Sequence, residues 1–236
     1  MKIALACAVL LGSTGCGLLD SSITTTSFVL PAQMFSLNTA MWSNLPSGGS
    51  TPAVPCGDGQ AVTDCCNPPA PLPTPDCTTT PLVCAPDSTG ANANICTAEI
   101  PESLANEINL GSAVPGLSSF PTGNITIASV KYTISDNTLN VDLPPVTVYL
   151  APDMVTDPKD TRAMVFGTIP AIPAGTDPTG EVQKDPSADH TFEMYAGSLS
   201  TPFEFIAATT VVIPSGTPIP SGQVTVSVTV TLSAHL

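Results

Sequence analysis

Positive charge is what the chain lacks most. Of its 236 residues only five are Lys or Arg, against 19 Asp or Glu, so the formal net charge is −14. Binding to nucleic acid depends on positive side chains that neutralise phosphates and release counterions, and an acidic surface repels the same backbone. The composition therefore excludes nucleic acid as a partner.

Aromatic residues and long apolar runs are also scarce. Phe, Trp and Tyr make up 5% of the chain, which is few for a site that stacks a ligand on exposed rings. The apolar run from Ile3 to Leu11 is much shorter than the roughly 20 residues of a membrane-spanning helix. Hydrophobic residues nonetheless reach 42%, too many for a wholly disordered chain.

The N-terminus has the pattern of a secretion signal. Lys2 precedes the apolar run, and the small residues 12–15 lead directly to Cys16. This segment resembles the bacterial lipobox, in which a signal peptidase cuts before a cysteine whose sulfur carries a diacylglyceryl group. Thr14 and Gly15 match that pattern, whereas Ser13 stands where an aliphatic residue is usual. The alternative is a conventional signal, cut within 13–19, that leaves a secreted protein.

The resemblance implies a cellular location as well as a membrane anchor. It makes residues 1–15 a signal peptide, Cys16 the site of lipidation with fatty acyl chains such as palmitate, and 16–22 a tether. Each buried methylene adds about 0.8 kcal/mol of membrane affinity, so two or three acyl chains hold a protein permanently. Gly17 follows the cysteine instead of Asp, and by the same resemblance this favours the outer membrane.

Cysteine usage agrees with export. Six cysteines lie in one short stretch, and an even number in an exported chain predicts three disulfides. Of 15 pairings, those that join adjacent Cys65 and Cys66 are strained, which leaves about 12. A metal site is disfavoured because there is no Cys-x-x-Cys pair and no nearby histidine. The six are Cys56, Cys65, Cys66, Cys77, Cys84 and Cys96.

The same stretch is rich in proline, most clearly in 67–75, and lacks apolar periodicity. Fixed proline angles and crosslinks restrict the unfolded chain, so such a segment can hold a shape without a large core. We expect residues 46–98 to form an insertion. It is either a rigid spacer or a displayed recognition surface.

Alternating apolar residues predict strands elsewhere in the chain. Strands are expected over 23–37, 146–150 and 203–213 and at the C-terminus. At the C-terminus every second residue is apolar and the intervening ones are Thr or Ser, as on a sheet with one buried face. The apolar residues of that last strand are Val224, Val226, Val228, Val230 and Leu232.

Three local features refine this pattern. Residues 130–134 and 139–143 alternate on either side of a turn at 135–138, which predicts a hairpin. Ile125 and Ile127 are in the opposite phase to Val130, which a β-bulge near residues 128–129 would reconcile. Ile100, Leu104 and Ile108 recur at helical spacing and predict a short helix.

These elements predict an all-β fold, an immunoglobulin-like two-sheet β-sandwich with a disulfide-rich, proline-rich insertion and at most one short helix. The N-terminal strands occupy 23–45 and the main part of the sandwich 99–236, on either side of the insertion.

No catalytic constellation is recognisable. Neither His190 nor His235 lies in a known motif, and no serine has the Gly-x-Ser-x-Gly pattern; His190 is expected in an exposed loop. We therefore expect a protein that is not an enzyme and has no cofactor. Asp153, Asp157 and Asp160 are weak calcium candidates, because their spacing does not match a calcium-binding loop.

The functional expectation is a noncatalytic cell-envelope lipoprotein with a structural or protein-interaction role. It would be attached to the outer membrane, facing the periplasm or the exterior, with the membrane and a protein as partners. The alternative is a surface-displayed ligand-binding or adhesive module, and a hydrolase is a third class.

Overall fold

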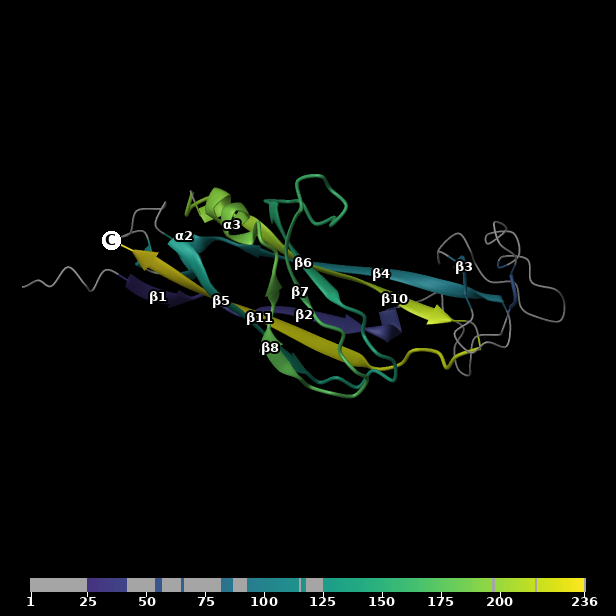
Figure 1. Cartoon of the computed structure of the whole chain (residues 1–236). Helices are drawn as coiled ribbons and strands as arrows, with labels where there is room; N and C mark the ends of the chain where they lie inside the picture. Colours follow the sequence, from purple (N-terminus) through teal and green to yellow (C-terminus); the bar gives the residue numbers. More distant parts are fainter. Residues whose placement is uncertain are drawn as a thin grey trace, which may run out of the picture.

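The protein folds as a sandwich of two antiparallel sheets (Figure 1). This confirms the predicted all-β, two-sheet architecture with disulfides. The computed structural model describes residues 25–41, 54–56, 65, 82–86, 93–114, 116–117, 125–196, 198–214 and 216–235.

The first sheet is built around β11 (Gln223–His235). On one side β11 pairs with β5 (Ile125–Ser135), which in turn pairs with β8 (Thr179–Glu181). On the other side β1 (Thr25–Val29) and β2 (Gln33–Asn38) lie end to end along it. The alternation predicted for β11 is confirmed, since its apolar residues are buried and its Thr and Ser residues are not.

The second sheet is built around β10 (Phe203–Pro214), a single strand flanked by β4 (Asn94–Ile108) and β6 (Val146–Pro152). Beyond β6 lie β7 (Met164–Ile169) and β9 (Gln183–Lys184), and beyond β4 lies β3 (Leu82–Pro86). Because β4 begins at Asn94, the last residues of the range expected as an insertion belong to a sandwich strand.

The main core lies between the sheets. Its aromatic part is a cluster of Phe166, Phe203 and Phe205, all fully buried, with ring centroids 5.4 Å apart for Phe166–Phe205 and 5.8 Å for Phe203–Phe205. Phe192 on α3 (Ala188–Ala196) joins the same core, so this helix covers one end of the sandwich. Burial of large apolar side chains supplies most of the driving force for folding.

The prediction of a helix over residues 100–108 is wrong. These residues form the second half of β4 and pair with β10 without interruption from Phe203↔Ile108 to Pro214↔Thr97. Pro101 is tolerated there because β4 beyond Ala98 has no second partner among the described strands, so its missing N–H breaks no ladder. Within the described ranges the structure has the short α-helices α2 (Leu110–Ala113) and α3, one more than the single short helix expected, besides the 3₁₀ turn η1 (Thr39–Met41).

The prediction of a hairpin over residues 130–143 is also wrong. The partners of β5 are β11 and β8, and the chain then crosses to the other sheet to begin β6. Leu143 still pairs, but with Ile172. Consecutive strands that belong to opposite layers of a sandwich cannot share a hydrogen-bonded ladder.

Asn137 fixes the corner where this crossing starts. Its side chain donates hydrogen bonds to the carbonyl oxygens of Pro173 (3.1 Å) and Thr176 (2.8 Å) and accepts one from the N–H of Leu139 (3.2 Å). Its own N–H donates to Asp177 Oδ1 at 3.1 Å. Such a buried, satisfied amide replaces the cross-strand bonds that a hairpin would have supplied.

The predicted β-bulge is confirmed. Ser129 pairs with Thr231 and Ile127 pairs with Leu232, so Ala128 is the extra residue in β5. The bulge turns Ile125 and Ile127 to the same buried face as Val130, and all three are buried.

Candidate functional site

The end of the sandwich that carries β3 is crosslinked and is the principal candidate site. We call it the disulfide tip, comprising residues 54–56, Cys65, β3 and residues 93–98. Two short segments flank the start of β4. On one side Cys84 of β3 lies opposite Cys96, and on the other Cys96 N–H donates to the carbonyl of Val54 at 2.9 Å.

Two disulfides join these segments. Cys56 is bonded to Cys84 and Cys65 to Cys96, at sequence separations of 28 and 31. The sequence predicted disulfides but left their pairing open, and Cys66 and Cys77 lie outside the described residues. Closing loops of this length stabilises a fold by about 3–4 kcal/mol per bridge in the chain-entropy model. The tip therefore depends on its crosslinks more than on its small apolar cluster of Val54, Cys65 and Cys96.

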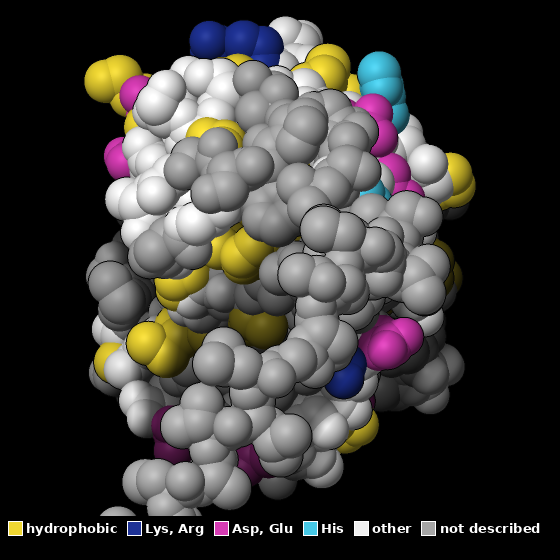
Figure 2. Space-filling model, turned by 90° about the vertical axis from the view of Figure 1, so that its left-hand side faces the viewer, with side chains coloured by type: hydrophobic (Ala, Val, Ile, Leu, Met, Phe, Trp, Pro, Cys, Tyr) yellow, Lys and Arg dark blue, Asp and Glu magenta, His cyan; other side chains and the backbone are white. Residues whose placement is uncertain are grey.

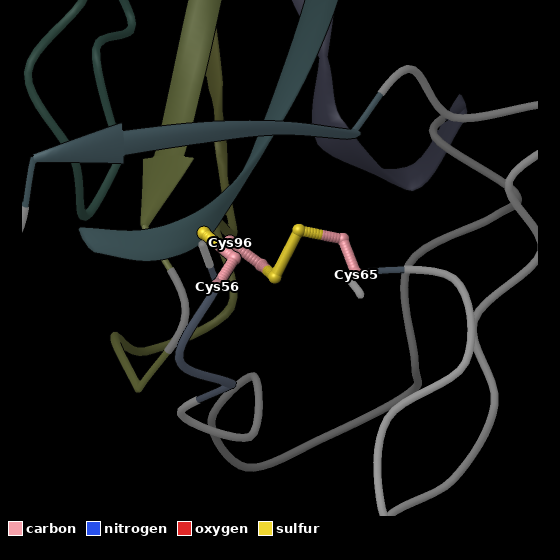
Figure 3. A group of neighbouring side chains, drawn as sticks. All are labelled: Cys56, Cys65 and Cys96. Carbon is pink, nitrogen blue, oxygen red and sulfur yellow. A yellow bond between two sulfur atoms is a disulfide. The ribbon is translucent and has the colours of Figure 1, made fainter. Parts of the chain in front are cut away.

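The two bridges differ in exposure but lie close together. Cys65 and Cys96 are buried, with 1% and 3% of their surface exposed, whereas Cys56 and Cys84 are partly exposed. The Sγ atoms of Cys56, Cys65 and Cys96 all lie within 4.8 Å of one another (Figure 3). A metal binds thiolates, and each of these sulfurs is bonded to another sulfur. The arrangement is therefore one of adjacent disulfides.

The structure does not bring together the three calcium candidates. Asp160 forms an ion pair with Arg162 at 2.7 Å, and hydrogen bonding to that guanidinium lowers the pKa of the Asp160 carboxyl to about 2. Asp157 accepts a hydrogen bond from the N–H of Lys159 at 2.8 Å. Both carboxylates organise their own turns, which is a common use of Asp in loops.

Asp153 instead lies with Glu107 and Glu204, and the carboxylate oxygens of the three are within 4.8 Å of one another. Glu107 and Glu204 face each other across the β4–β10 ladder. The sequence reasoning missed this group, although Glu204 interrupts the apolar run 203–206 and such a charge is a recognisable signal. Glu204 is 6% exposed and accepts a hydrogen bond from the backbone N–H of Met154.

Burial raises the pKa of Glu204 above its ordinary value, and the nearby carboxylates of Glu107 and Asp153 raise it further. A raised pKa in the folded state means that folding favours the protonated form. Protonation of Glu204 therefore contributes to the stability of the fold most fully at low pH. This contribution is lost as the pH rises from the pKa of Glu204 in the unfolded chain through its higher pKa in the folded protein.

We expect Glu204→Gln to stabilise the protein at pH 7 by about 0.5–1 kcal/mol, the scale of a like-charge pair across a ladder. Gln retains an oxygen for the N–H of Met154 while removing the charge. Below about pH 4 the parent carboxyl is protonated, and the gain should vanish. Urea unfolding at both pH values measures this gain. Glu193→Gln is the control, because Glu193 is exposed and lies outside the group of three carboxylates. A gain that is equal at the two pH values would refute the explanation.

The two histidines do not form a catalytic group. His190 lies exposed on α3, not in a loop as expected, with Glu193 Oε2 at 4.0 Å from its Nδ1. His235, at the end of β11, shares a hydrogen bond with the Thr25 hydroxyl at 2.9 Å. Among the described residues no helix has the length and apolar content needed to cross a bilayer.

Comparison with known proteins adds little. No family model matches the chain, and no curated protein matches it. A chain from Israeli acute paralysis virus, heated to 63 degrees as the full particle, aligns over 100% of this chain and 85% of its own at 10% identity, with a TM-score of 0.32. One from Turnip Yellow Mosaic Virus at 100 K covers 59% of this chain and 92% of its own at 20% identity, with a TM-score of 0.25. Scores this low support no conclusion about function.

Proposed function

We propose that the protein is a noncatalytic cell-envelope lipoprotein, anchored to the outer membrane through Cys16, whose sandwich has a structural or protein-binding role. The observation that carries the proposal is the position of the first strand. β1 begins at Thr25, nine residues after Cys16, at the end of the sandwich opposite the disulfide tip (Figure 1).

The lengths of the tether and of β4 define how the anchored protein would be oriented relative to the membrane. Thr25 pairs with His235, so the entry point of the chain lies beside its last strand residue. Nine extended residues reach about 30 Å at most. β4 runs 15 residues from the tip toward the other end, and strands rise about 3.4 Å per residue, which makes it about 50 Å long. An anchor at Cys16 thus holds the disulfide tip away from the bilayer.

The character of the two ends supports this orientation. Figure 2 looks onto the end that carries β1, α2 and α3, and hydrophobic side chains are visible near the middle of the view. Partly buried apolar residues of this region include Phe28, Ala113 and Leu199. The opposite end carries the disulfides, which persist in oxidising compartments outside the cytoplasm. An apolar end near the lipid and a crosslinked end far from it suit an envelope protein.

The anchor is tested with one substitution. In the bacterial host, Cys16→Ser should move most of the protein from the membrane to the soluble fraction without changing its melting temperature, since residue 16 precedes the sandwich. Cys7→Ser, the same change within the predicted signal peptide, should leave the protein in the membrane. Mass spectrometry of the mature protein should find an acylated N-terminal Cys16. Retention of the Cys16→Ser variant in the membrane would overturn the proposal.

The second candidate is a surface-displayed ligand-binding or adhesive module. It is favoured by the outward position that the anchor would give the disulfide tip. Protease treatment of intact cells separates the two, because a domain facing the periplasm survives and a displayed one is lost.

A further inference from the structure

The two disulfides of the tip form a closely spaced pair with unequal access to solvent. The Cys56–Cys84 bridge is partly exposed, and the Cys65–Cys96 bridge is almost completely buried. A thiol in solution therefore reaches the first bridge more readily than the second, because exchange requires direct attack on a sulfur.

Cys56 is the residue that connects the two bridges. Its Sγ lies within 4.8 Å of both sulfurs of the buried bridge, whereas Cys84 Sγ does not belong to this group (Figure 3). The backbone holds Cys56 in place, since Pro55 forms a β-bridge with Ile95 and Cys56 N–H donates to the carbonyl of Asn94 at 3.4 Å. Residues 54–56, which carry Cys56, are therefore held against the start of β4, which carries Cys96.

We infer that the tip is a thiol–disulfide exchange site in which Cys56 relays reduction from the exposed bridge to the buried one. The substrates are thiols, either a small dithiol or a cysteine pair of a partner protein. The inference rests on the geometry of the tip and holds whether or not Cys16 is lipidated.

The chemistry takes two steps. A dithiol reduces the Cys56–Cys84 bridge and is itself oxidised to a disulfide, and its two electrons and two protons produce the thiols of Cys56 and Cys84. Cys56 then loses its proton, and the thiolate attacks one sulfur of the Cys65–Cys96 bridge. A new bond forms to that sulfur, the old bond breaks, and the other cysteine leaves as a thiolate that takes up a proton. The second step involves no net oxidation or reduction.

Exchange would change what holds the tip together. In the oxidised state the Cys56–Cys84 bond spans the start of β4 and ties residues 54–56 to β3. After exchange Cys56 is bonded to Cys65 or Cys96, and β3 keeps its backbone pairing with β4 but loses its covalent link to residues 54–56. The tip thus has two covalent states that differ in the attachment of β3.

A matched pair of variants of the full chain tests the inference. Cys84→Ser leaves Cys56 without its disulfide partner, and Cys56→Ser leaves Cys84 without its partner. Each protein is incubated at pH 8, trapped by alkylation and mapped by mass spectrometry under nonreducing conditions. We expect most of the Cys84→Ser protein to contain Cys56 bonded to Cys65 or Cys96, and the Cys56→Ser protein to retain Cys65–Cys96. Retention of the native buried bridge in both variants, or equal scrambling in both, would overturn the relay.

A kinetic measurement covers the case in which either single variant folds poorly. With dithiothreitol as the probe, the Cys65–Cys96 bridge of the parent protein should open at least about tenfold faster than in the double variant Cys56→Ser/Cys84→Ser, because the adjacent thiolate acts at a high effective concentration. If removal of the first bridge merely loosened the tip, the double variant would be reduced faster. That result, or equal rates, would contradict the inference.

Discussion

Replacing Gly222 with Ala is expected to destabilise the protein by about 4 kcal/mol or more, among the largest effects of a single substitution. Gly222 has φ of +106°, a conformation that L side chains rarely adopt. An added Cβ would collide with the carbonyl group of Thr138 and lie 2.9 Å from Leu139 N. These are backbone atoms, so no side-chain rotation relieves the clash.

The surrounding backbone also resists movement. Thr138 N–H donates to the carbonyl of Gln223 at 2.8 Å, and the Gly222 carbonyl accepts from Thr39 N–H at 3.1 Å. Three chain segments therefore meet at this glycine. Moving any one of them to admit a methyl group breaks bonds that the others need.

Gly175→Ala is the matched control. Gly175 also has positive φ, +62°, but nothing lies within 4 Å of an added Cβ. The substitution should therefore cost only the backbone term, about 1–2 kcal/mol. Thermal unfolding of both variants separates the steric and conformational contributions, and equal losses of melting temperature would show that the contact with Thr138 is unimportant.

Phe205→Ala is expected to cost about 3–5 kcal/mol, the usual range for removal of a buried Phe. Phe205 is fully buried on the central strand β10, and its ring contacts those of Phe166 and Phe203. The aromatic cluster joins β10 to β7, so the cavity would lie among strands that cannot collapse without breaking the sheet. For a domain of this size the melting temperature should fall by about 6–20 °C.

Val212→Ala is the control on the same strand. Val212 is 49% exposed, and its loss should change stability by no more than about 0.5 kcal/mol. Denaturant unfolding followed by circular dichroism provides both values. A cost below about 1 kcal/mol for Phe205→Ala would mean that the cluster is less tightly packed than its burial indicates.

The strands with strict alternation were predictable because their information is local. In β11 each buried residue is apolar and each intervening residue carries a hydroxyl, so period and face follow from the sequence itself. The bulge at Ala128 was predictable for the same reason, since a change of phase within an apolar run requires an extra residue.

The errors arose where distant segments compete with local signals. Ile100, Leu104 and Ile108 have helical spacing, but β10 offers a complete ladder to the whole of β4. The turn at 135–138 is suited to a hairpin, yet β11 pairs with β5 over a longer length than the segment 139–143 could. Pairing between strands far apart in sequence overrides local propensity, which is a weak determinant of structure.

Some features of the candidate site were likewise predictable from the sequence, and others were not. The acidic charge, the alternation of apolar and hydroxyl residues along the strands, and the clustering of cysteines between 56 and 96 can all be read from the amino-acid sequence, because they are properties of composition and spacing. The pairing of the cysteines, the position of Cys56 beside the buried bridge and the opposition of Glu204 and Glu107 follow from the three-dimensional fold. Those facts depend on β3, β4 and β10 lying side by side, and strand pairing at long range is not encoded in any one segment.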